Sequence, residues 1–179
     1  DVYKRQAFSR SETRQNNAIQ SLLKGIYPMY KILFVCHGNI CRSPMAEFVM
    51  KDIVAKAGKS DEFVIASCAT STEEIGNPVH YGTKRKLAEV GISYDKKRAV
   101  QLTKSDYDRY DYIIAMDEMN IRNIMRIIRS DPENKVSLLL SHAGIDGSIA
   151  DPWYTGNFDD TYRDVLLGCK GLFKEVTGE

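Results

Sequence analysis

Four short apolar runs, separated by helical patterns, restrict the possible folds of this chain more than any other feature of its sequence. The runs cover residues 32–35, 63–66, 112–115 and 136–140. They are almost wholly apolar and rich in β-prone residues, which is typical of strands in a parallel sheet buried on both faces. The chain is therefore predicted to have a sheet of four strands in its core.

Helical periodicity fills the segments between and after these runs. Apolar residues recur at spacings of three and four within residues 45–57, 84–90, 121–128 and 159–176. Strands that alternate with helices need right-handed crossovers, which place helices on both faces of a parallel sheet. The prediction is an α/β fold, with one domain of three α/β/α layers around a central four-stranded parallel sheet. Ligands of such folds bind beyond the carboxyl ends of the strands, here after Val35, Ala66 and Ala115.

The first 29 residues differ from the rest of the chain. They are polar, rich in Arg, Gln, Asn and Ser, and carry three more positive than negative charges. We interpret residues 1–29 as an extension outside the fold, either disordered or an artefact, and residues 30–179 as the folded domain. Since the whole chain has a net charge of +1, the domain has a net charge near −2. This charge gives no support for a nucleic-acid-binding surface, which needs clustered Lys and Arg.

The apolar and cysteine content narrows the expected setting of the protein. No segment approaches the ~20 apolar residues that a membrane helix needs, and the N-terminal segment lacks the apolar stretch of a secretion signal. The four cysteines show neither metal-ligand spacing nor the density of a disulfide-rich secreted protein. We therefore expect a cytoplasmic protein with no membrane association, no metal and no cofactor.

The segment after the first strand has the character of an anion-binding loop. Cys36 follows the strand directly, and Ser43-Pro44 is a typical helix start, with Ser43 as the N-cap. Such a loop turns its N–H groups inward against the positive end of the helix dipole, and Gly38 is expected to supply an unusual backbone angle. The predicted phosphate-binding residues are His37, Gly38, Asn39, Ile40, Cys41, Arg42 and Ser43.

Cys36 and Arg42 supply the chemistry that such a loop allows. An anion site beside a cation and a helix N-terminus favours a thiolate, which is a nucleophile. Arg42 offers a phosphoryl group two parallel N–H donors and stabilises the charge that develops during transfer. The Ser43 hydroxyl is expected to hydrogen-bond the thiolate. The Cys and Arg spacing alone is also compatible with a buried Cys and a solvent-facing Arg, but its position between strand and helix favours a phosphate loop.

A phosphate ester also needs an acid that protonates the leaving oxygen. Asp151-Pro152-Trp153-Tyr154 is the candidate segment, because Pro152 biases Asp151 to an extended backbone and the two aromatic residues suit the walls of a slot for a phenyl ring. The alternative is a simple turn at Asp151-Pro152, with Trp153 and Tyr154 in the core.

The segment from Val35 to Glu47, together with Asp151-Pro152-Trp153-Tyr154 near the C-terminus, resembles the low molecular weight protein tyrosine phosphatase family. The resemblance runs from about Lys31 to the end of the chain, and the segments 101–103 and 115–117 also resemble the family. Two motifs in the correct order at opposite ends of the domain make the resemblance specific.

The resemblance implies a two-step hydrolysis of phosphotyrosine, in proteins or small aryl phosphates, that releases inorganic phosphate. Cys36 takes the phosphoryl group while Asp151 protonates the leaving oxygen, and Asp151 then activates the water that cleaves phosphocysteine. Asn39 resembles the family residue that holds the loop in shape. Cys41 resembles a second thiol that pairs reversibly with Cys36 on oxidation, although a small loop-packing residue is the alternative. The protein is expected to be a monomer or weak dimer.

The expected substrate slot is formed by Ile40, Glu73, Trp153 and Tyr154. Glu73 falls where relatives often place an aromatic residue, and this acidic rim suggests a preference for basic phosphopeptides. His37 replaces an apolar residue, and we favour a rim position over a role as an added phosphate-binding cation. Lys97 stands where some relatives have a His that supports the loop.

Three other functions are compatible with parts of the sequence. Protein arginine phosphatases have Thr at the position of Ile40, so Ile40 and the pair Trp153-Tyr154 favour an aromatic ester. A thiol-dependent arsenate reductase needs a further pair of redox cysteines, and Cys68 and Cys169 do not form one in the sequence. A phosphate-binding module without catalysis would be expected to lack Cys36 or Asp151.

Overall fold

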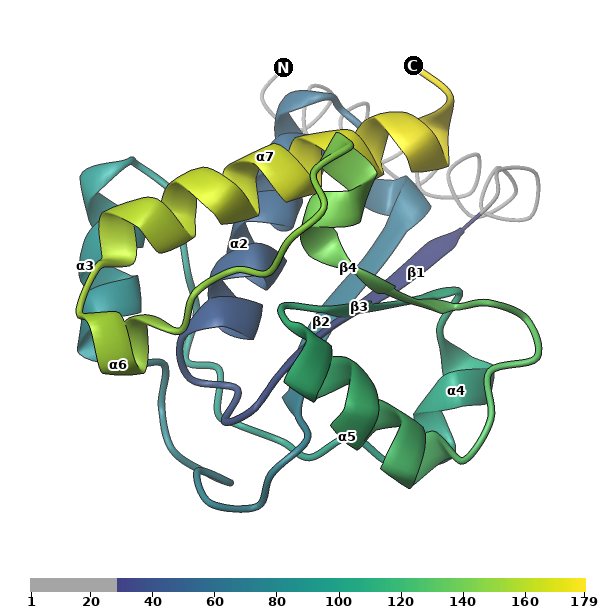
Figure 1. Cartoon of the computed structure of the whole chain (residues 1–179). Coiled ribbons are helices and arrows are strands. Elements are labelled where there is room, and N and C mark those ends of the chain that lie inside the picture. Colours follow the sequence, from purple (N-terminus) through teal and green to yellow (C-terminus); the bar gives the residue numbers. More distant parts are fainter. Residues whose placement is uncertain (1–28) are drawn as a thin grey trace, which may run out of the picture.

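The computed structural model describes residues 29–179 and shows helices packed on both faces of a parallel four-stranded sheet (Figure 1). The strand order is β2-β1-β3-β4, and each neighbouring pair is parallel. The strands are β1 (Tyr30–Cys36), β2 (Phe63–Ala69), β3 (Tyr112–Ala115) and β4 (Val136–Leu138). The α/β fold class predicted from the sequence is confirmed.

Successive residues of β1 face opposite sides of the sheet and so divide the interior into two cores. Ile32 and Phe34 lie in the larger core, which contains side chains of α2 (Arg42–Lys56) and α7 (Phe158–Thr177). Leu33 and Val35 lie in the smaller core beneath α5 (Glu118–Ile128). Because β1 is buried on both faces, its sequence is continuously apolar rather than alternating.

Shorter helices complete the fold of residues 29–179 (Figure 1). They are α3 (Tyr81–Glu89), α4 (Asp106–Arg109) and α6 (Pro152–Thr155), with two 3-10 turns, η1 (Ser60–Glu62) and η2 (Leu139–Ala143). The short helix α6 lies beside the start of α7, near α3. This arrangement brings the C-terminal part of the chain close to the loop after β1.

The fourth strand is shorter than predicted. It ends at Leu138, and Leu139 and Leu140 belong to the turn η2, so the predicted strand is wrong for its last two residues. The reason lies in α7, where Gly168 allows a close approach: a Cβ at this position would lie 2.5 Å from Cγ of Leu139. Leu139 therefore turns away from the sheet and fills the core beneath α7, where it is fully buried.

The predicted N-terminal extension over residues 1–29 lies, apart from Met29, outside the described residues. Within residues 29–179, no helix is long and apolar enough to cross a membrane.

Candidate active site

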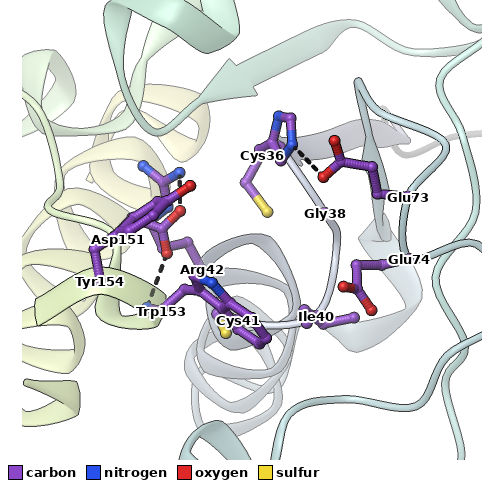
Figure 2. A pocket seen from close by; sticks show the side chains of 11 residues that line it. Cys36, Gly38, Ile40, Cys41, Arg42, Glu73, Glu74, Asp151, Trp153 and Tyr154 are labelled. Atoms are coloured by element: carbon purple, nitrogen blue, oxygen red, sulfur yellow. Dashed lines mark hydrogen bonds and ion pairs between the residues drawn. The ribbon is translucent and has the colours of Figure 1, made fainter. Parts of the chain in front are cut away.

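A pocket opens at the carboxyl end of β1, between the loop that leads into α2 and the short helix α6 (Figure 2). Its floor consists of the loop from Cys36 to Ser43, and its rim carries residues of the segments around Glu73 and Trp153. The lining residues are Cys36, His37, Gly38, Ile40, Cys41, Arg42, Glu73, Glu74, Asp151, Trp153 and Tyr154. The structure thus brings together segments that are more than 100 residues apart in sequence.

Asn39, not Gly38, supplies the unusual backbone angle of the loop. Asn39 has a φ of 57°, in the left-handed region, whereas Gly38 is absent from the glycines with positive φ. The prediction for Gly38 is therefore wrong. Asn tolerates this conformation better than most residues. Gly38 instead permits a close approach, because a Cβ there would lie 3.2 Å from Cγ of Glu74.

The side chain of Asn39 fastens the loop to the neighbouring strand. Its Nδ2 donates to Oγ of Ser43 and to Oγ of Ser67, both at 2.9 Å. Its Oδ1 accepts a hydrogen bond from the backbone N–H of Val100 at 3.2 Å. Asn39 is only 1% exposed, so the structure depends on these bonds to satisfy its amide.

The sulfur of Cys36 lies at the centre of this loop. Its Sγ accepts a hydrogen bond from the backbone N–H of Asn39 at 3.3 Å and lies 3.0 Å from Oγ of Ser43. Donors at this distance stabilise negative charge on sulfur. The loop therefore directs two hydrogen-bonding groups, of Asn39 and Ser43, at the sulfur.

Ser43 does not cap α2 as predicted. The helix begins at Arg42, its N-cap residue is Cys41, and no side chain accepts a capping hydrogen bond there. The prediction of a Ser43 N-cap is wrong because its hydroxyl is engaged with the sulfur of Cys36 and the amide of Asn39. The Ser-Pro pair lies inside the first turn.

Arg42 is buried at the floor and joins two carboxylates. Its Nη1 donates to Oδ2 of Asp117 at 2.6 Å and to the carbonyl of Ile149 at 3.0 Å. Its Nη2 donates to Oδ2 of Asp151 at 2.9 Å. Burial opposes the charge of Arg42, but the negative charges of Cys36, Asp151 and Asp117 raise its pKa above the ordinary value. The Nε atom is buried and has no hydrogen-bond partner among the described residues.

Asp117 is a site residue that was not predicted from the sequence. It follows β3, caps α5 by accepting from the backbone N–H of Asn120 at 2.7 Å, and holds Arg42 with its other oxygen. Two signals pointed to it: its place just after Ala115 at the carboxyl end of a strand, and its resemblance to the family segment. Glu74, which also lines the pocket, was not predicted either.

Asp151 lies at the N-cap of α6, with Pro152 at the first helical position. Its backbone is extended, as predicted, and its Oδ1 accepts from the N–H of Trp153 at 3.1 Å while Oδ2 binds Arg42. Trp153 is 57% exposed and Tyr154 is 83% exposed, so neither is a core residue. Their side chains stand with Asp151 on one side of the pocket, opposite Glu73 and Glu74 (Figure 2).

A buried charge network supports the loop from behind. The carboxylate of Glu47, which is 5% exposed, accepts from Oγ of Ser67 at 2.6 Å and pairs with Lys97 at 3.4 Å and Lys51 at 2.5 Å. Lys97 also donates to the carbonyl of Ser67 at 3.0 Å. Since Oγ of Ser67 accepts a hydrogen bond from Asn39, the network connects Lys97 with the loop after β1.

The four cysteines are all free thiols with different surroundings. Burial, helped by the charges of Cys36 and Asp151, raises the pKa of Cys41 to about 12. Burial also raises the pKa of Cys68 and of Cys169 well above the ordinary value. Cys68 lies in β2 and Cys169 lies in α7, and neither lines the pocket.

His37 lies at the rim of the pocket. Its Nε2 is 3.0 Å from Oε2 of Glu73, and the side chains of both residues are largely exposed. Figure 2 shows Glu73 at the edge of the pocket, with Glu74 on the same side. Within residues 29–179, no group of three or more His, Cys, Asp and Glu side chains is arranged to hold a metal ion.

Similarity to known proteins agrees with this site. Residues 31–179 match the family described as low molecular weight phosphotyrosine protein phosphatase. The chain belongs to this family. Among members of the low molecular weight phosphatases, it is similar to YfkJ of Bacillus subtilis, with 39% identity over 84% of this chain and 98% of that protein. It is also similar to the enzyme of Schizosaccharomyces pombe, with 42% identity over 82% of this chain and 96% of the relative.

Solved structures of the low molecular weight phosphatases have the same fold. The crystal structure of YfkJ aligns with a TM-score of 0.80 at 38% identity, covering 84% of this chain and 96% of that one. The crystal structure of an arginine phosphatase from drosophila aligns with a TM-score of 0.74 at 28% identity, covering 82% and 97%. The fold therefore does not by itself distinguish the two substrates.

Proposed function

We propose that this low molecular weight phosphatase hydrolyses phosphotyrosine through a phosphocysteine on Cys36. The observation that supports this most directly is the convergence of three groups on one pocket: the sulfur of Cys36, the guanidinium of Arg42 and the carboxyl group of Asp151. A nucleophile, a phosphate clamp and an acid are the groups that this reaction needs.

In the first step, the thiolate of Cys36 attacks phosphorus. The S–P bond forms, the bond from phosphorus to the phenolic oxygen breaks, and Asp151 gives its proton to that oxygen. The incoming phosphate competes for Nη2 of Arg42, which in the free protein binds Asp151. Nε of Arg42, which has no partner among the described residues, offers the phosphoryl group a second donor.

In the second step, a water molecule attacks phosphorus through its oxygen, and the carboxylate of Asp151 takes a proton from this water. The S–P bond breaks, inorganic phosphate forms, and the thiolate of Cys36 is restored. The hydrogen bonds to this sulfur from Asn39 and Ser43 make it a better leaving group. No cofactor takes part in either step. Asp117 holds Arg42 from the opposite side throughout.

The proposed substrate slot lies between Ile40 at the floor and Trp153, Tyr154 and Glu73 at the rim. Trp153 and Tyr154 are exposed, so they can accept a phenyl ring without displacing core side chains. The substrates are phosphotyrosine in proteins or small aryl phosphates. Under oxidation Cys41, which lines the same pocket, is the expected partner of Cys36. A cytoplasmic location stays a prediction.

Protein arginine phosphatase is the second candidate function, because the drosophila arginine phosphatase shares this fold. Ile40 and the aromatic pair favour phosphotyrosine. Arsenate reduction is less well supported, since Cys68 and Cys169 are 2% and 0% exposed and lie on separate elements.

The test is release of inorganic phosphate from a phosphotyrosine peptide and from phosphoarginine, in EDTA, by the wild type and by Cys36→Ser. Cys169→Ala, which removes a thiol from α7 outside the pocket, is the control. We expect phosphotyrosine turnover that the control keeps and Cys36→Ser loses. A clear preference for phosphoarginine would reassign the substrate, and turnover by Cys36→Ser at the wild-type rate would contradict the mechanism.

A further inference from the structure

His80 lies outside the pocket lining but contacts two of the segments that build the site, the loop after β1 and the segment around Trp153. It is the N-cap residue of α3, and its Nδ1 accepts a hydrogen bond from the backbone N–H of Gly82 at 3.1 Å. Its own backbone N–H donates to the carbonyl of Ile40, in the phosphate loop, at 2.8 Å. The backbone of His80 thus ties α3 to the floor of the pocket.

The ring of His80 forms an aromatic cluster with residues of the C-terminal segment. It stacks on Phe158, the first residue of α7, with ring centroids 5.3 Å apart and an interplanar angle of 8°. It also meets Trp153 edge-on, with centroids 5.7 Å apart and an angle of 73°. Trp153 and Phe158 flank the turn that follows Asp151, so one ring contacts both ends of this segment.

The packing around this cluster leaves little freedom. A Cβ at position 82 would clash with the ring of Phe158, so the glycine after His80 and Tyr81 is needed for the stack to form. Phe158 is 8% exposed. Burial lowers the pKa of His80, with Glu74 partly opposing the shift. The neutral ring is therefore favoured at neutral pH, and only a neutral ring can accept at Nδ1.

From these contacts we propose that His80 is a positioning residue, whose ring holds Trp153, and with it the turn that carries Asp151, at a fixed place relative to the phosphate loop. His80 acts through Trp153 and Ile40 and does not touch the substrate. The effect on catalysis rests on the proposed function of the site. The effect on the position of Trp153 does not rest on the proposed function. The positioning of Trp153 and the function of the site can therefore be tested separately.

Two substitutions separate the ring of His80 from its capping role. His80→Asn keeps a side chain that caps helices well but removes the ring. His80→Phe keeps an aromatic ring but removes the acceptor for the N–H of Gly82. His142→Asn, which removes a different His ring, on η2 and outside the pocket, is the control for a general loss of packing.

Trp153 is the only tryptophan of the chain, so its fluorescence reports directly on the proposed contact. We expect acrylamide to quench Trp153 more strongly in His80→Asn than in the wild type, because the ring no longer covers one edge of the indole. His80→Phe and His142→Asn should be quenched like the wild type. This measurement needs no enzymatic activity.

The kinetic readout uses two leaving groups. A phosphotyrosine peptide needs protonation by Asp151, whereas p-nitrophenyl phosphate has a leaving group that needs it less. In His80→Asn we expect kcat/KM to fall for both substrates, by about two- to tenfold, the range expected for the loss of one aromatic pair. The decrease in kcat/KM should be larger for the phosphotyrosine peptide, and for this substrate it should come more from a lower kcat than from a higher KM. His80→Phe should stay close to the wild type on both.

The proposal is overturned if His80→Asn shows wild-type quenching and wild-type kinetics. It is also overturned if His80→Phe is impaired as much as His80→Asn, since the capping hydrogen bond and not the ring would then be the determinant. If fluorescence changes as expected but no variant or wild-type protein releases phosphate, the positioning of Trp153 stands and the proposed function fails.

Discussion

The floor and the rim of the pocket differ in how tightly their side chains are held. At the floor, Asn39, Arg42 and Ser43 are at most 3% exposed, and each makes two or more side-chain hydrogen bonds. At the rim, Trp153 and Tyr154 are more than half exposed, and His37 pairs only with the exposed Glu73. Buried side chains held by several hydrogen bonds keep one geometry, whereas exposed side chains adapt. The floor should therefore set the chemistry and the rim the choice of substrate.

The largest expected difference concerns two cysteines of the same loop. Since burial raises the pKa of Cys41 to about 12, its thiolate makes up only about one part in 10⁵ at pH 7. Because only thiolates are alkylated, iodoacetamide at pH 7 should modify Cys36 and leave Cys41 intact. Peptide mapping by mass spectrometry measures this, and reaction at Cys41 should rise about tenfold for each pH unit below 12. Equal labelling of both at pH 7 would show that the loop does not distinguish them.

Replacing the guanidinium at the floor should impair every substrate. Arg42→Lys keeps the charge but loses the planar set of donors that joins Asp117, Asp151 and the phosphoryl group. We expect kcat/KM for p-nitrophenyl phosphate to fall by about 10²- to 10³-fold, as for the loss of one preorganised donor to a transition state. Circular dichroism serves to verify the fold. A fall of less than tenfold would mean that charge alone suffices.

The hydrogen bonds of Asn39 are tested against a matched residue. Asn134 also has a positive φ, of 53°, so replacement by Ala should cause similar backbone strain at both positions. Unlike Asn39, Asn134 is exposed. Asn39→Ala leaves the hydroxyls of Ser43 and Ser67 without their amide donor, and should lower the free energy of unfolding by about 1–3 kcal/mol more than Asn134→Ala. Urea unfolding measures this difference. Equal losses would remove the buried bonds from the explanation.

The smallest effect is expected at the rim. Glu73 is an exposed carboxylate beside His37, so Glu73→Gln should change the ratio of kcat/KM for basic and acidic phosphopeptides by only about two- to fivefold, towards acidic peptides. Added salt should reduce the difference. Activity on p-nitrophenyl phosphate, which has no flanking residues, should not change. A ratio that stays constant, or shifts the other way, argues against an acidic rim that selects basic peptides.

The sequence predicted the elements well where the signal is local. The four runs correspond to the four strands, since strands buried on both faces are continuously apolar. The segment from Cys36 to Arg42 was found because a loop between a strand and a helix is contiguous in sequence. The end of β4 was not predicted, because it depends on Gly168, a residue nearly 30 positions later.

Contacts between distant segments escaped prediction for a similar reason. Asp117 binds Arg42 only because β3 lies beside β1, an adjacency that no local pattern encodes. The roles of Gly38 and Ser43 were predicted from their general preferences, for unusual angles and for helix caps. In the structure, Asn39 has the unusual angle, and Ser43 is not the N-cap of α2. The Ser43 hydroxyl lies 3.0 Å from the sulfur of Cys36, a contact that was predicted from the sequence.

The central claim is that Cys36, held at a rigid floor, carries the phosphoryl group. The most direct test is to quench the wild type and Asp151→Asn during turnover of p-nitrophenyl phosphate and to map the phosphorylated residue by mass spectrometry. Asp151→Asn should accumulate the intermediate, since this substrate needs little acid assistance to form it but its hydrolysis lacks a base. The account predicts one phosphoryl group, on Cys36. A phosphoryl group on another residue, or none in either protein while phosphate is released, would contradict it.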